Sequence, residues 1–200
     1  RMRVLVISQY YWPESFRIND LTDDLVRRGH QVTVLTGVPN YPLGSMFPEY
    51  ENEPKAYCSY KGVEIVRVPI VVRGQSGGQL ALNYLSFIIS GKTIGLFKLR
   101  KQRFDSIFVF EPSPITVGLP AIVFRYFKKA PLAFWVLDLW PDTLEAVGVV
   151  RSERILKLVG WLVSYIYKRC DLVLAQSKSF ISHIRKYADH DRVAYFPGWA

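Results

Sequence analysis

Two carboxylates at the end of an apolar run are the residues of this chain best suited to chemistry. In FWVLDLWPDT (134–143), residues typical of a buried strand lead to Asp138 and then, through Trp140 and Pro141, to Asp142. A cap on the following helix would explain Asp142, which directly precedes TLEAVG. Capping does not explain Asp138, which has four apolar or aromatic residues immediately before it. Asp138 is therefore the first candidate for a chemical role, at the rim of a ligand cleft, and Asp142 is a cap that can take a second role.

A second group of candidates lies where the first predicted strand is followed by a helix. Arg17, Asn19 and Asp20 fall in the first turns of that helix. The N–H groups and the dipole of a helix start attract anions, and Arg17 adds a fixed positive charge. An ordinary solvent-exposed helix start, capped by Glu14 or Ser15, is an alternative of equal weight.

Two later strand ends carry further polar residues. FEPSP places Glu111 and Ser113 just past a strand, where two prolines fix the turn. A cap-and-turn arrangement explains these two residues at least as well as contact with a ligand does. In AQSKS, Ser177 is a natural N-cap for the next helix, and Gln176 is a candidate for lining a cleft.

The familiar cofactor and metal motifs are absent from the sequence. The segment after the first strand is SQYYWPES and not the G-x-G-x-x-G of a dinucleotide site, and there is no Walker A motif and no G-x-S-x-G elbow. The histidines and cysteines form no metal-binding or disulfide pattern: His30, His183, His190, Cys58 and Cys170. We therefore expect no cofactor, no metal and a reducing compartment.

Segments typical of strands and of helices alternate along the chain. Apolar, β-branched runs predict strands at 3–8, 30–36, 62–72, 105–110, 131–137, 171–175 and 192–196. Helical periodicity occupies the intervals between most of them, whereas 37–61, with four prolines, is expected to be a long loop. This alternation predicts an α/β fold, a Rossmann-like parallel sheet of about seven strands with helices on both faces. In such sheets the ligand binds beyond the carboxyl ends of the strands, where the candidates above lie.

Two of the helical stretches are apolar nearly all round. The thin polar stripe of 79–102 consists of Asn83, Ser86, Ser90 and Thr93, and that of 155–168 of Lys157, Gly160, Ser164 and Lys168. Both stretches have basic ends, and a single sheet cannot easily cover both on all sides. Helices of this kind belong in a large core or against a nonpolar partner. Packing against a core or subunit and contact with a membrane surface are both open.

The bulk composition sets limits on the compartment and the partners. The chain has 200 residues, 50% of them hydrophobic, with a formal net charge of +9. This suits one domain with a full core, and the charge favours anionic partners. The sequence shows no signal peptide and no run of about 18 uninterrupted apolar residues, so we expect a cytoplasmic protein that does not cross a membrane.

Three segments together resemble a known family. VISQYYWPESFRINDL, LVRRGHQVTVLTGVPNYP and VLDLWPDTLEAVGV are similar to the N-terminal half of glycosyltransferase family 4 enzymes with the GT-B fold. Within that family the chain looks like the bacterial branch that builds cell-surface polysaccharide, including the amino-sugar (L-fucosamine-type) transferases of O-antigen and lipopolysaccharide assembly. The resemblance covers essentially the whole chain and ends at VAYFPGWA, where the family's interdomain linker would begin.

The resemblance implies one half of a two-domain enzyme. Residues 1–196 would form the acceptor-side domain and 197–200 the start of the linker, with the donor-binding domain missing from this chain. The reaction implied is transfer of a sugar, without a metal and with retention, from a nucleotide-diphosphate sugar to a hydroxyl of a lipid-linked saccharide. A UDP-sugar is the expected donor, and a peripheral position on the inner face of the plasma membrane would suit such an acceptor.

The resemblance also assigns roles to single residues. Asp138 matches a position where many relatives have a His or Asp facing the reacting sugar, so it would orient the acceptor hydroxyl or stabilise positive charge at the anomeric carbon. Asp142 and Glu14 are the next catalytic candidates. The candidates for substrate contact are Arg17, Asn19, Tyr11, Trp12, Glu111, Ser113 and Gln176. Many relatives have a Gly-Gly pair where this chain has Phe16 and Arg17.

Two other functions are consistent with the same residues. Half of a GT-B sugar-nucleotide epimerase would use the same fold. A basic, non-enzymatic α/β module would bind nucleic acid or a partner protein, but its recognised sequence motifs are absent and the aromatic residues gather at strand ends. We therefore expect no nucleic acid partner.

Overall fold

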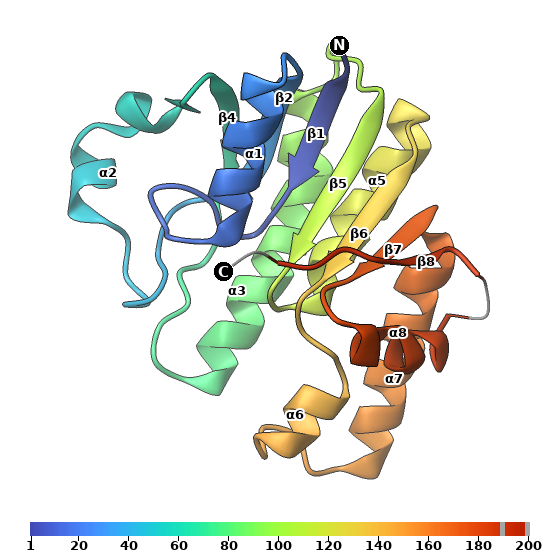
Figure 1. Ribbon diagram of the computed structural model, residues 1–200. Coiled ribbons are helices and arrows are strands. Elements are labelled where there is room, and N and C mark those ends of the chain that lie inside the picture. Colours follow the sequence, from blue (N-terminus) through green and yellow to red (C-terminus); the bar gives the residue numbers. More distant parts are fainter. Residues whose placement is uncertain (189–190, 199–200) are drawn as a thin grey trace.

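The computed structural model describes residues 1–188 and 191–198 of the chain (Figure 1). One eight-stranded sheet runs through it, in the order β3-β4-β2-β1-β5-β6-β7-β8. All neighbouring strands are parallel except β3 and β4. The strands are β1 (Arg3–Ile7), β2 (Gln31–Gly37), β3 (Ser59–Tyr60), β4 (Val63–Val68), β5 (Ser106–Glu111), β6 (Leu132–Val136), β7 (Leu172–Ala175) and β8 (Val193–Tyr195).

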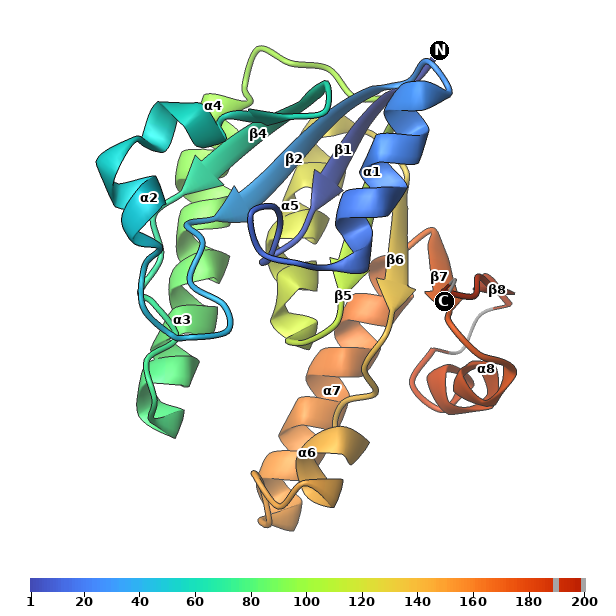
Figure 2. The same ribbon diagram turned by 60° about the vertical axis from the view of Figure 1, so that its left-hand side comes forward.

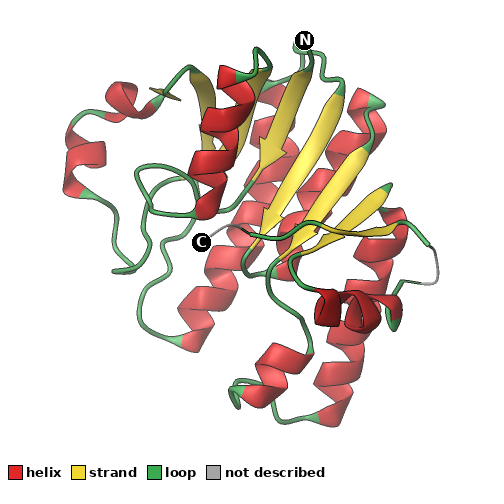
Figure 3. Cartoon of the chain, viewed as in Figure 1, coloured by secondary structure: helices red, strands yellow, loops and turns green. Residues whose placement is uncertain are grey.

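The helices form two layers, one on each face of the sheet (Figures 2 and 3). One face carries α1 (Arg17–Arg27). The other face carries α3 (Gly77–Ser90), its π-helical continuation η2 (Gly91–Gly95) and α4 (Leu96–Lys98), then η3 (Ile115–Val117), α5 (Gly118–Lys128), α7 (Glu153–Arg169) and α8 (Lys178–Arg185). The short helix α6 (Asp142–Ala146) follows the carboxyl end of β6.

This architecture confirms the predicted α/β fold with a Rossmann-like parallel sheet. The sheet has one strand more than expected, because β3 lies inside 37–61, where we expected a long loop. The same segment also contains α2 (Pro48–Asn52) and the 3₁₀ turn η1 (Pro54–Tyr57). Each begins with a proline, whose fixed backbone angle suits the first position of a helix. Two of the prolines that indicated a loop are therefore helix starts.

The strand expected over 62–72 is shorter than predicted. β4 ends at Val68, and the next residue is Pro69, which has no N–H to donate to a neighbouring strand. Residues beyond Pro69 lead into the turn before α3.

The central strands are buried on both faces. In β1, Leu5 and Ile7 belong to the core on the side of α3, α5 and α7, whereas Val4 and Val6 belong to the core under α1. All four are at most 7% exposed. Successive side chains of a strand point to opposite faces, so a strand covered on both sides has no polar alternation. This explains the continuous apolar run VLVI of residues 4–7.

One helix in the described part of the chain has the length and composition of a membrane span, namely the continuous Gly77–Lys98. Only 28% of its most apolar stretch is buried. This helix has no long uninterrupted apolar run, because Asn83, Ser86 and Ser90 interrupt it without making the helix polar on average. Phe87 is nevertheless fully buried against the sheet, so the helix is also part of the domain's own core.

Gly118 provides a test of the packing between the sheet and this helical layer. A Cβ at Gly118 would lie 2.5 Å from Ile166 Cγ2 in α7 and 3.0 Å from Phe134 Cε2 in β6. We expect Gly118→Ala to lower the free energy of unfolding by about 1–3 kcal/mol, the usual cost of forcing an extra carbon into a packed core. Urea unfolding measures the change.

The matched control is Gly78→Ala in the first turn of α3, where a Cβ meets nothing within 4 Å. We expect that variant to be as stable as the wild type, or more stable by up to about 1 kcal/mol, because alanine favours a helix. Equal stability of Gly118→Ala and the wild type would contradict the packing described here.

Candidate functional site

The carboxyl ends of the central strands meet at one edge of the sheet (Figures 1 and 3). Ile7 of β1 is in register with Val109 of β5, and Glu111 at the end of β5 is in register with Val136 of β6. The segments that leave these strands therefore start side by side. This edge brings together the loops that carry Glu14, Glu111 and Asp138.

Glu14 joins its own loop, which follows β1, to the loop that follows β2. Its Oε2 accepts hydrogen bonds from the backbone N–H groups of Asn40 at 3.0 Å and Tyr41 at 2.8 Å, and its Oε1 accepts one from Tyr11 N at 3.2 Å. The residue is 2% exposed. Burial raises the pKa of this carboxyl, while the three N–H groups and the charge of Arg67 act in the opposite direction. The structure thus gives Glu14 a positioning role, with its oxygens occupied by backbone donors.

The start of α1 is tied down by Asn19. Its Nδ2 donates to Glu14 O at 2.8 Å, and its Oδ1 accepts from Trp12 N at 3.2 Å. The residue at the N-cap position is Phe16, whose side chain makes no cap hydrogen bond. The expected cap by Glu14 or Ser15 is therefore wrong, because the loop places Phe16 there instead.

Arg17 and the two aromatic candidates, Tyr11 and Trp12, differ in how exposed they are to solvent. Arg17 is exposed at the first position of α1, with its guanidinium close to the backbone of Gly198. Tyr11 is fully buried, and its hydroxyl is 2.6 Å from Thr22 Oγ1. Trp12 is half-buried and stacks on Tyr60, with ring centres 4.6 Å apart. Of these three, Arg17 is the most exposed.

Asp138 has both oxygens held by its own loop. Trp140 Nε1 donates to Oδ2 at 3.1 Å, and Thr143 Oγ1 donates to Oδ1 at 2.6 Å. The residue is partly exposed, so a ligand can reach a carboxylate whose position is already fixed. Such a group can stabilise positive charge without first reorganising.

Asp142 joins two helices and does not cap one. It is the first residue of α6, the N-cap position is held by Pro141, and that end has no side-chain cap. Its Oδ2 lies 2.7 Å from His183 Nε2 of α8, an ion pair when the histidine is protonated. The interpretation as a cap is therefore wrong, although an acidic residue in the first turn still favours the helix dipole.

Glu111 is a buried carboxyl at the end of β5. It is 0% exposed, and in the described part of the chain neither side-chain oxygen accepts a hydrogen bond of regular geometry. Burial raises the pKa of Glu111 well above its ordinary value, and the negative charge of Asp138 raises it further. The backbone N–H groups of Leu137 and Asp138 act in the opposite direction. Glu111 lies behind Asp138 and is closed to a ligand.

The other two candidates lie partly exposed at the same edge. Ser113 follows β5 by two residues, next to Pro114. Gln176 follows β7, and its Nε2 donates to Leu137 O at 3.4 Å. Gln176 therefore connects the loop after β7 with the loop that carries Asp138.

Sequence reasoning missed a polar cluster beneath this edge. Gln9 and Asn83, at most 2% exposed, are joined by a hydrogen bond of 2.7 Å from Gln9 Nε2 to Asn83 Oδ1. Arg73 donates to the hydroxyl of Tyr10 and lies over the Tyr10 and Tyr41 rings. The signal for Gln9 was its place directly after the first strand, whereas nothing in the sequence pairs Arg73 with Tyr10 across a distance of 63 residues.

Arg67 is a second residue that sequence reasoning missed. It is a buried arginine of β4 that donates to Gly37 O at 3.1 Å, to Tyr57 O at 3.2 Å and to Trp12 O. Burial lowers its pKa, and the charge of Glu14 opposes that change. Arg67 and Glu14 are thus two buried, opposite charges that hold the loops at this edge.

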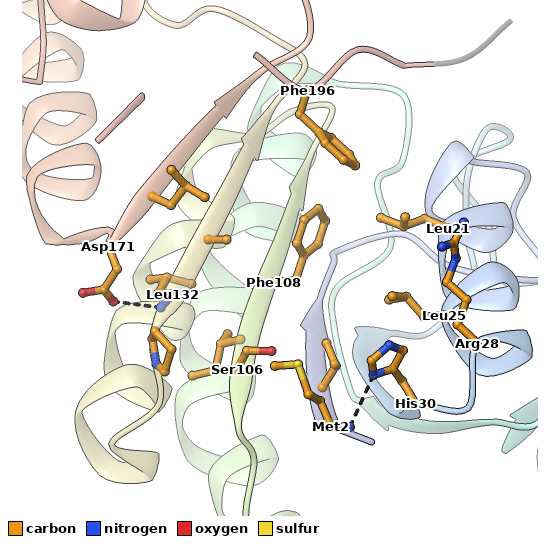
Figure 4. A pocket seen from close by; sticks show the side chains of 15 residues that line it. Met2, Leu21, Leu25, Arg28, His30, Ser106, Phe108, Leu132, Asp171 and Phe196 are labelled. Carbon is orange, nitrogen blue, oxygen red and sulfur yellow. Dashed lines mark hydrogen bonds between the residues drawn. The ribbon is translucent and has the colours of Figure 1, made fainter. Parts of the chain in front are cut away.

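An apolar groove of about 540 Å³ lies away from the strand ends (Figure 4). It runs between α1 and β5–β7, with Leu21 and Leu25 on one side and Phe108 and Phe196 on the other. Parallel sheets are normally covered on both faces, and here α1 covers only part of its face. The groove is not at the edge where the polar candidates gather.

A more polar pocket of about 450 Å³ adjoins that edge. It lies between α6, α7 and α8, and its lining includes Asp142, Lys157, Trp161 and Lys186. The lysines of this pocket can bind anionic groups of a ligand, and the exposed indole of Trp161 can stack on a ring of a polar ligand.

Among the described residues, no group of three or more His, Cys, Asp and Glu is arranged to hold a metal. His190 and the last two residues of the expected linker, 199–200, lie outside the described residues.

The comparisons with known proteins agree with this fold. The family described as a glycosyl transferase 4-like domain matches residues 15–199. No match was found among the curated proteins.

Several solved structures superpose on the chain. Sucrose-phosphate synthase from Thermosynechococcus elongatus does so with a TM-score of 0.68 and 12% identity, over 100% of this chain and 49% of that one. The calicheamicin glycosyltransferase CalG4 superposes with a TM-score of 0.58 and 15% identity, over 100% of this chain and 55% of that one. Anabaena HepE, in complex with UDP and glucose, superposes with a TM-score of 0.55 and 12% identity, over 98% of this chain and 44% of that one. The chain thus spans about half the length of these structures and has the fold of one Rossmann-like half of a GT-B enzyme.

The three hydrogen bonds to Glu14 give a first prediction for this site. In Glu14→Gln, one oxygen becomes an NH₂ group that cannot accept, so at least one backbone N–H loses its partner. We expect the free energy of unfolding to fall by about 1–3 kcal/mol. We also expect faster hydrogen exchange at the amides of Tyr11, Asn40 and Tyr41. Glu49→Gln, on the exposed surface of α2, is the control, and unchanged exchange in Glu14→Gln would contradict the role assigned to Glu14.

The buried carboxyl of Glu111 predicts a pH dependence of stability. Its pKa is higher in the folded state than the ordinary value of 4.5. The stability that it contributes is therefore complete below about pH 4.5 and is lost as the pH rises through the folded-state pKa. We expect Glu111→Gln to gain stability relative to the wild type as the pH rises from 4.5 to 8, measured by urea unfolding.

Glu145→Gln, which removes an exposed carboxylate from α6, controls for the loss of one charge. A constant difference between the wild type and Glu111→Gln across this pH range would mean that Glu111 is not desolvated as described.

Proposed function

The chain belongs to the glycosyl transferase 4-like domain family, and from this premise we propose that it is the acceptor-binding half of a retaining, metal-independent glycosyltransferase. The enzyme would move a sugar from a nucleotide-diphosphate sugar to a hydroxyl of a lipid-linked saccharide. Residues 1–196 form the acceptor-side domain, 197–200 begin the linker, and a second Rossmann-like domain binds most of the donor. The observation that carries the proposal is the family match over residues 15–199.

The structural neighbours support a nucleotide-sugar donor. Anabaena HepE was solved with UDP and glucose, and Arabidopsis thaliana UGT89C1, with a TM-score of 0.57 and 14% identity, was solved with UDP. We infer that the donor used with this domain is a UDP-sugar. Arg17 stands at the start of α1, where a cation beside helical N–H groups favours an anion. It is our candidate for contact with a phosphate of the donor or the acceptor.

Asp138 is the proposed catalytic residue. Transfer breaks the bond between the anomeric carbon and the diphosphate, forms a bond from that carbon to the acceptor oxygen, and releases the hydroxyl proton. Positive charge develops on the sugar while the old bond breaks. A carboxylate held by Trp140 and Thr143 is preorganised to stabilise that charge or to orient the hydroxyl. Asp142 and Glu14 support the reaction by positioning, the first through α8 and the second through the loops that it joins.

The acceptor would lie over the edge that carries Asp138, Ser113 and Gln176. The pocket between α6, α7 and α8 offers Trp161 for a sugar ring and Lys157 and Lys186 for anionic groups. The segments PESFRINDL and DLWPD support the polysaccharide branch of the family, with O-antigen and lipopolysaccharide assembly as the setting and amino-sugar transfer as the reaction. The place of action is the cytoplasmic face of the membrane.

The proposal is tested by Asp138→Asn in the protein that also carries the donor-binding half. We expect kcat for sugar transfer to fall by about 100-fold or more, because a preorganised charge is lost from the transition state, while the melting temperature stays near that of the wild type. The measurement is release of UDP with lipid-linked saccharide as acceptor.

Thr143→Val separates the charge of Asp138 from the order of its loop. It removes the 2.6 Å hydrogen bond to Oδ1 and keeps the carboxylate, so we expect a smaller loss than in Asp138→Asn. An activity of Asp138→Asn near that of the wild type would remove Asp138 from the mechanism. Epimerised nucleotide sugar formed without acceptor would indicate an epimerase instead.

A further inference from the structure

Helix α3 buries polar side chains beside Phe87 on its inner side and exposes apolar side chains on its outer side. Asn83 is fully buried, with Nδ2 donating to Val71 O at 2.6 Å, and Ser90 is 7% exposed. Leu82 and Leu85 on the outer side are 54% and 50% exposed. Ordinary surface helices bury their apolar stripe and expose their polar one. The outer side of α3 is therefore suited to a nonpolar environment.

Helix α7 shares the exposed apolar residues of α3, although its inner side is largely apolar, with Val163, Ile166 and Tyr167 at most 1% exposed. Gly160 is buried, and Ser164 Oγ donates to Tyr187 O at 2.6 Å on the inner side. Leu158 and Trp161 on the outer side are 60% and 73% exposed. Of its polar stripe, Gly160 and Ser164 face inward, whereas Lys157 and Lys168 are exposed.

The outer sides of α3, α5 and α7 form one surface, which we call the α3–α7 face. It consists of the exposed side chains of segments 77–103, 118–130 and 151–169, which pack against the same side of the sheet (Figures 1 and 2). Single exposed apolar residues are normal, but a set gathered on one side indicates an interaction surface. The further exposed apolar side chains of this face are Ile89, Ile94, Phe97, Tyr126, Phe127, Ile155 and Tyr165.

The same three segments hold the excess positive charge of the chain. They contain 13 of the 26 lysines and arginines but only one of the 17 acidic residues, Glu153, and so have a net charge of +12. Since the whole chain has +9, the rest of it has −3. Arg125 is paired with Asp171, and the Nζ atoms of Lys98 and Lys128 donate to backbone carbonyls. Even with those three positive charges set aside, the α3–α7 face remains strongly cationic.

Two arginines lie directly on exposed aromatic rings of this face. The guanidinium carbon of Arg100 is 3.9 Å from the centre of the Phe97 ring, and that of Arg169 is 3.6 Å from the centre of the Tyr165 ring. Such pairs present an apolar ring and a cation at one point. The boundary between the headgroups and the acyl chains of an anionic bilayer accommodates both.

The charge distinguishes among the surfaces that could cover this face. A second copy of the chain would bring its own cationic face against this one, and like charges repel. A nucleic acid would match the charge but would leave Leu82, Leu85 and Leu158 without a nonpolar partner. An anionic lipid bilayer offers both acyl chains and negative headgroups.

We propose that the α3–α7 face docks the domain on an anionic phospholipid membrane. The proposal deepens the proposed function, on which it rests for the lipid-linked acceptor. In Figures 1 and 2, α3 and the pair α6–α7 extend past the carboxyl ends of the strands. Docking by these helices would bring that edge, with Asp138, to the headgroup layer where the hydroxyl of a lipid-linked saccharide lies.

The test is co-sedimentation of the chain with vesicles that contain neither donor nor acceptor. We expect binding to mixed phosphatidylcholine–phosphatidylglycerol vesicles, weak binding to phosphatidylcholine alone, and a decrease as salt is raised. We expect Leu85→Glu with Leu158→Glu to weaken binding by about tenfold or more, because two carboxylates would have to enter the interface. Arg151→Glu with Arg154→Glu should weaken it by a similar factor through charge.

Matched controls lie outside this face. Leu43→Glu changes a leucine that is 71% exposed in a loop, and Lys55→Glu with Lys178→Glu reverses two exposed charges elsewhere on the domain. These variants should bind vesicles within about twofold of the wild type, since they touch no part of the proposed face. Circular dichroism and melting temperatures verify that each variant is folded.

Three outcomes would overturn the proposal. They are no binding to phosphatidylglycerol vesicles, equal binding by the face variants and their controls, and a dimer in solution that Leu158→Glu abolishes while vesicles stay unbound. Because the vesicles contain no sugar substrate, vesicle binding by the chain, with no transfer activity in the protein that also carries the donor-binding half, would refute the proposed function alone. Transfer to a soluble acceptor without vesicle binding would refute the docking face alone.

Discussion

The site of this domain depends on a buried carboxylate, that of Glu14. Parallel strands bring their carboxyl ends to one edge, but the loops that leave those ends have no regular partners of their own. Glu14 supplies partners to Tyr11, Asn40 and Tyr41 at once, and Arg67 ties Trp12, Gly37 and Tyr57 from the other side. A buried charge is costly when it has no partner, but here hydrogen bonds to backbone groups and the opposite charge compensate for the burial of Glu14 and of Arg67. These two residues therefore fix the loops at this edge of the sheet.

The loop after β6 shows how one strand end can assign different duties to two carboxylates. Asp138 keeps its oxygens within the loop and remains accessible, whereas Asp142, one turn further on, connects α6 with α8 through His183. Behind them Glu111 is buried so completely that ionising it is unfavourable beside Asp138. At this edge of the sheet the domain thus has an accessible carboxylate, a bridging one and a buried one, which differ in burial and in hydrogen-bond or ion-pair partners.

The parts of the structure that follow from periodicity could be predicted from the sequence. Continuous apolar runs such as VLVI (4–7) indicate strands buried on both faces, and their alternation with helices predicts the parallel sheet and the edge where Asp138 lies. Long-range partners could not be predicted: nothing local shows that Glu14 meets Asn40, that Arg67 reaches Trp12, or that Asp142 finds His183 and does not cap α6. Prolines were misleading in 37–61, because the same residue that interrupts a strand can begin a helix. The apolar helices indicated an unusual surface, but the burial of Asn83 and Ser90 on the inner side of α3 is visible only in three dimensions.

The division of charge between the α3–α7 face and the rest of the domain has a consequence for motion. A molecule with +12 in the segments of that face and −3 in the rest of the chain has a permanent electric dipole directed toward that face. Near a negative surface the field acts over roughly one Debye length, about 8 Å at physiological salt, and exerts a torque on that dipole. The domain would be rotated during its approach, so that the α3–α7 face turns toward the membrane before any side chain makes contact. Fewer encounters would then fail because of a wrong orientation.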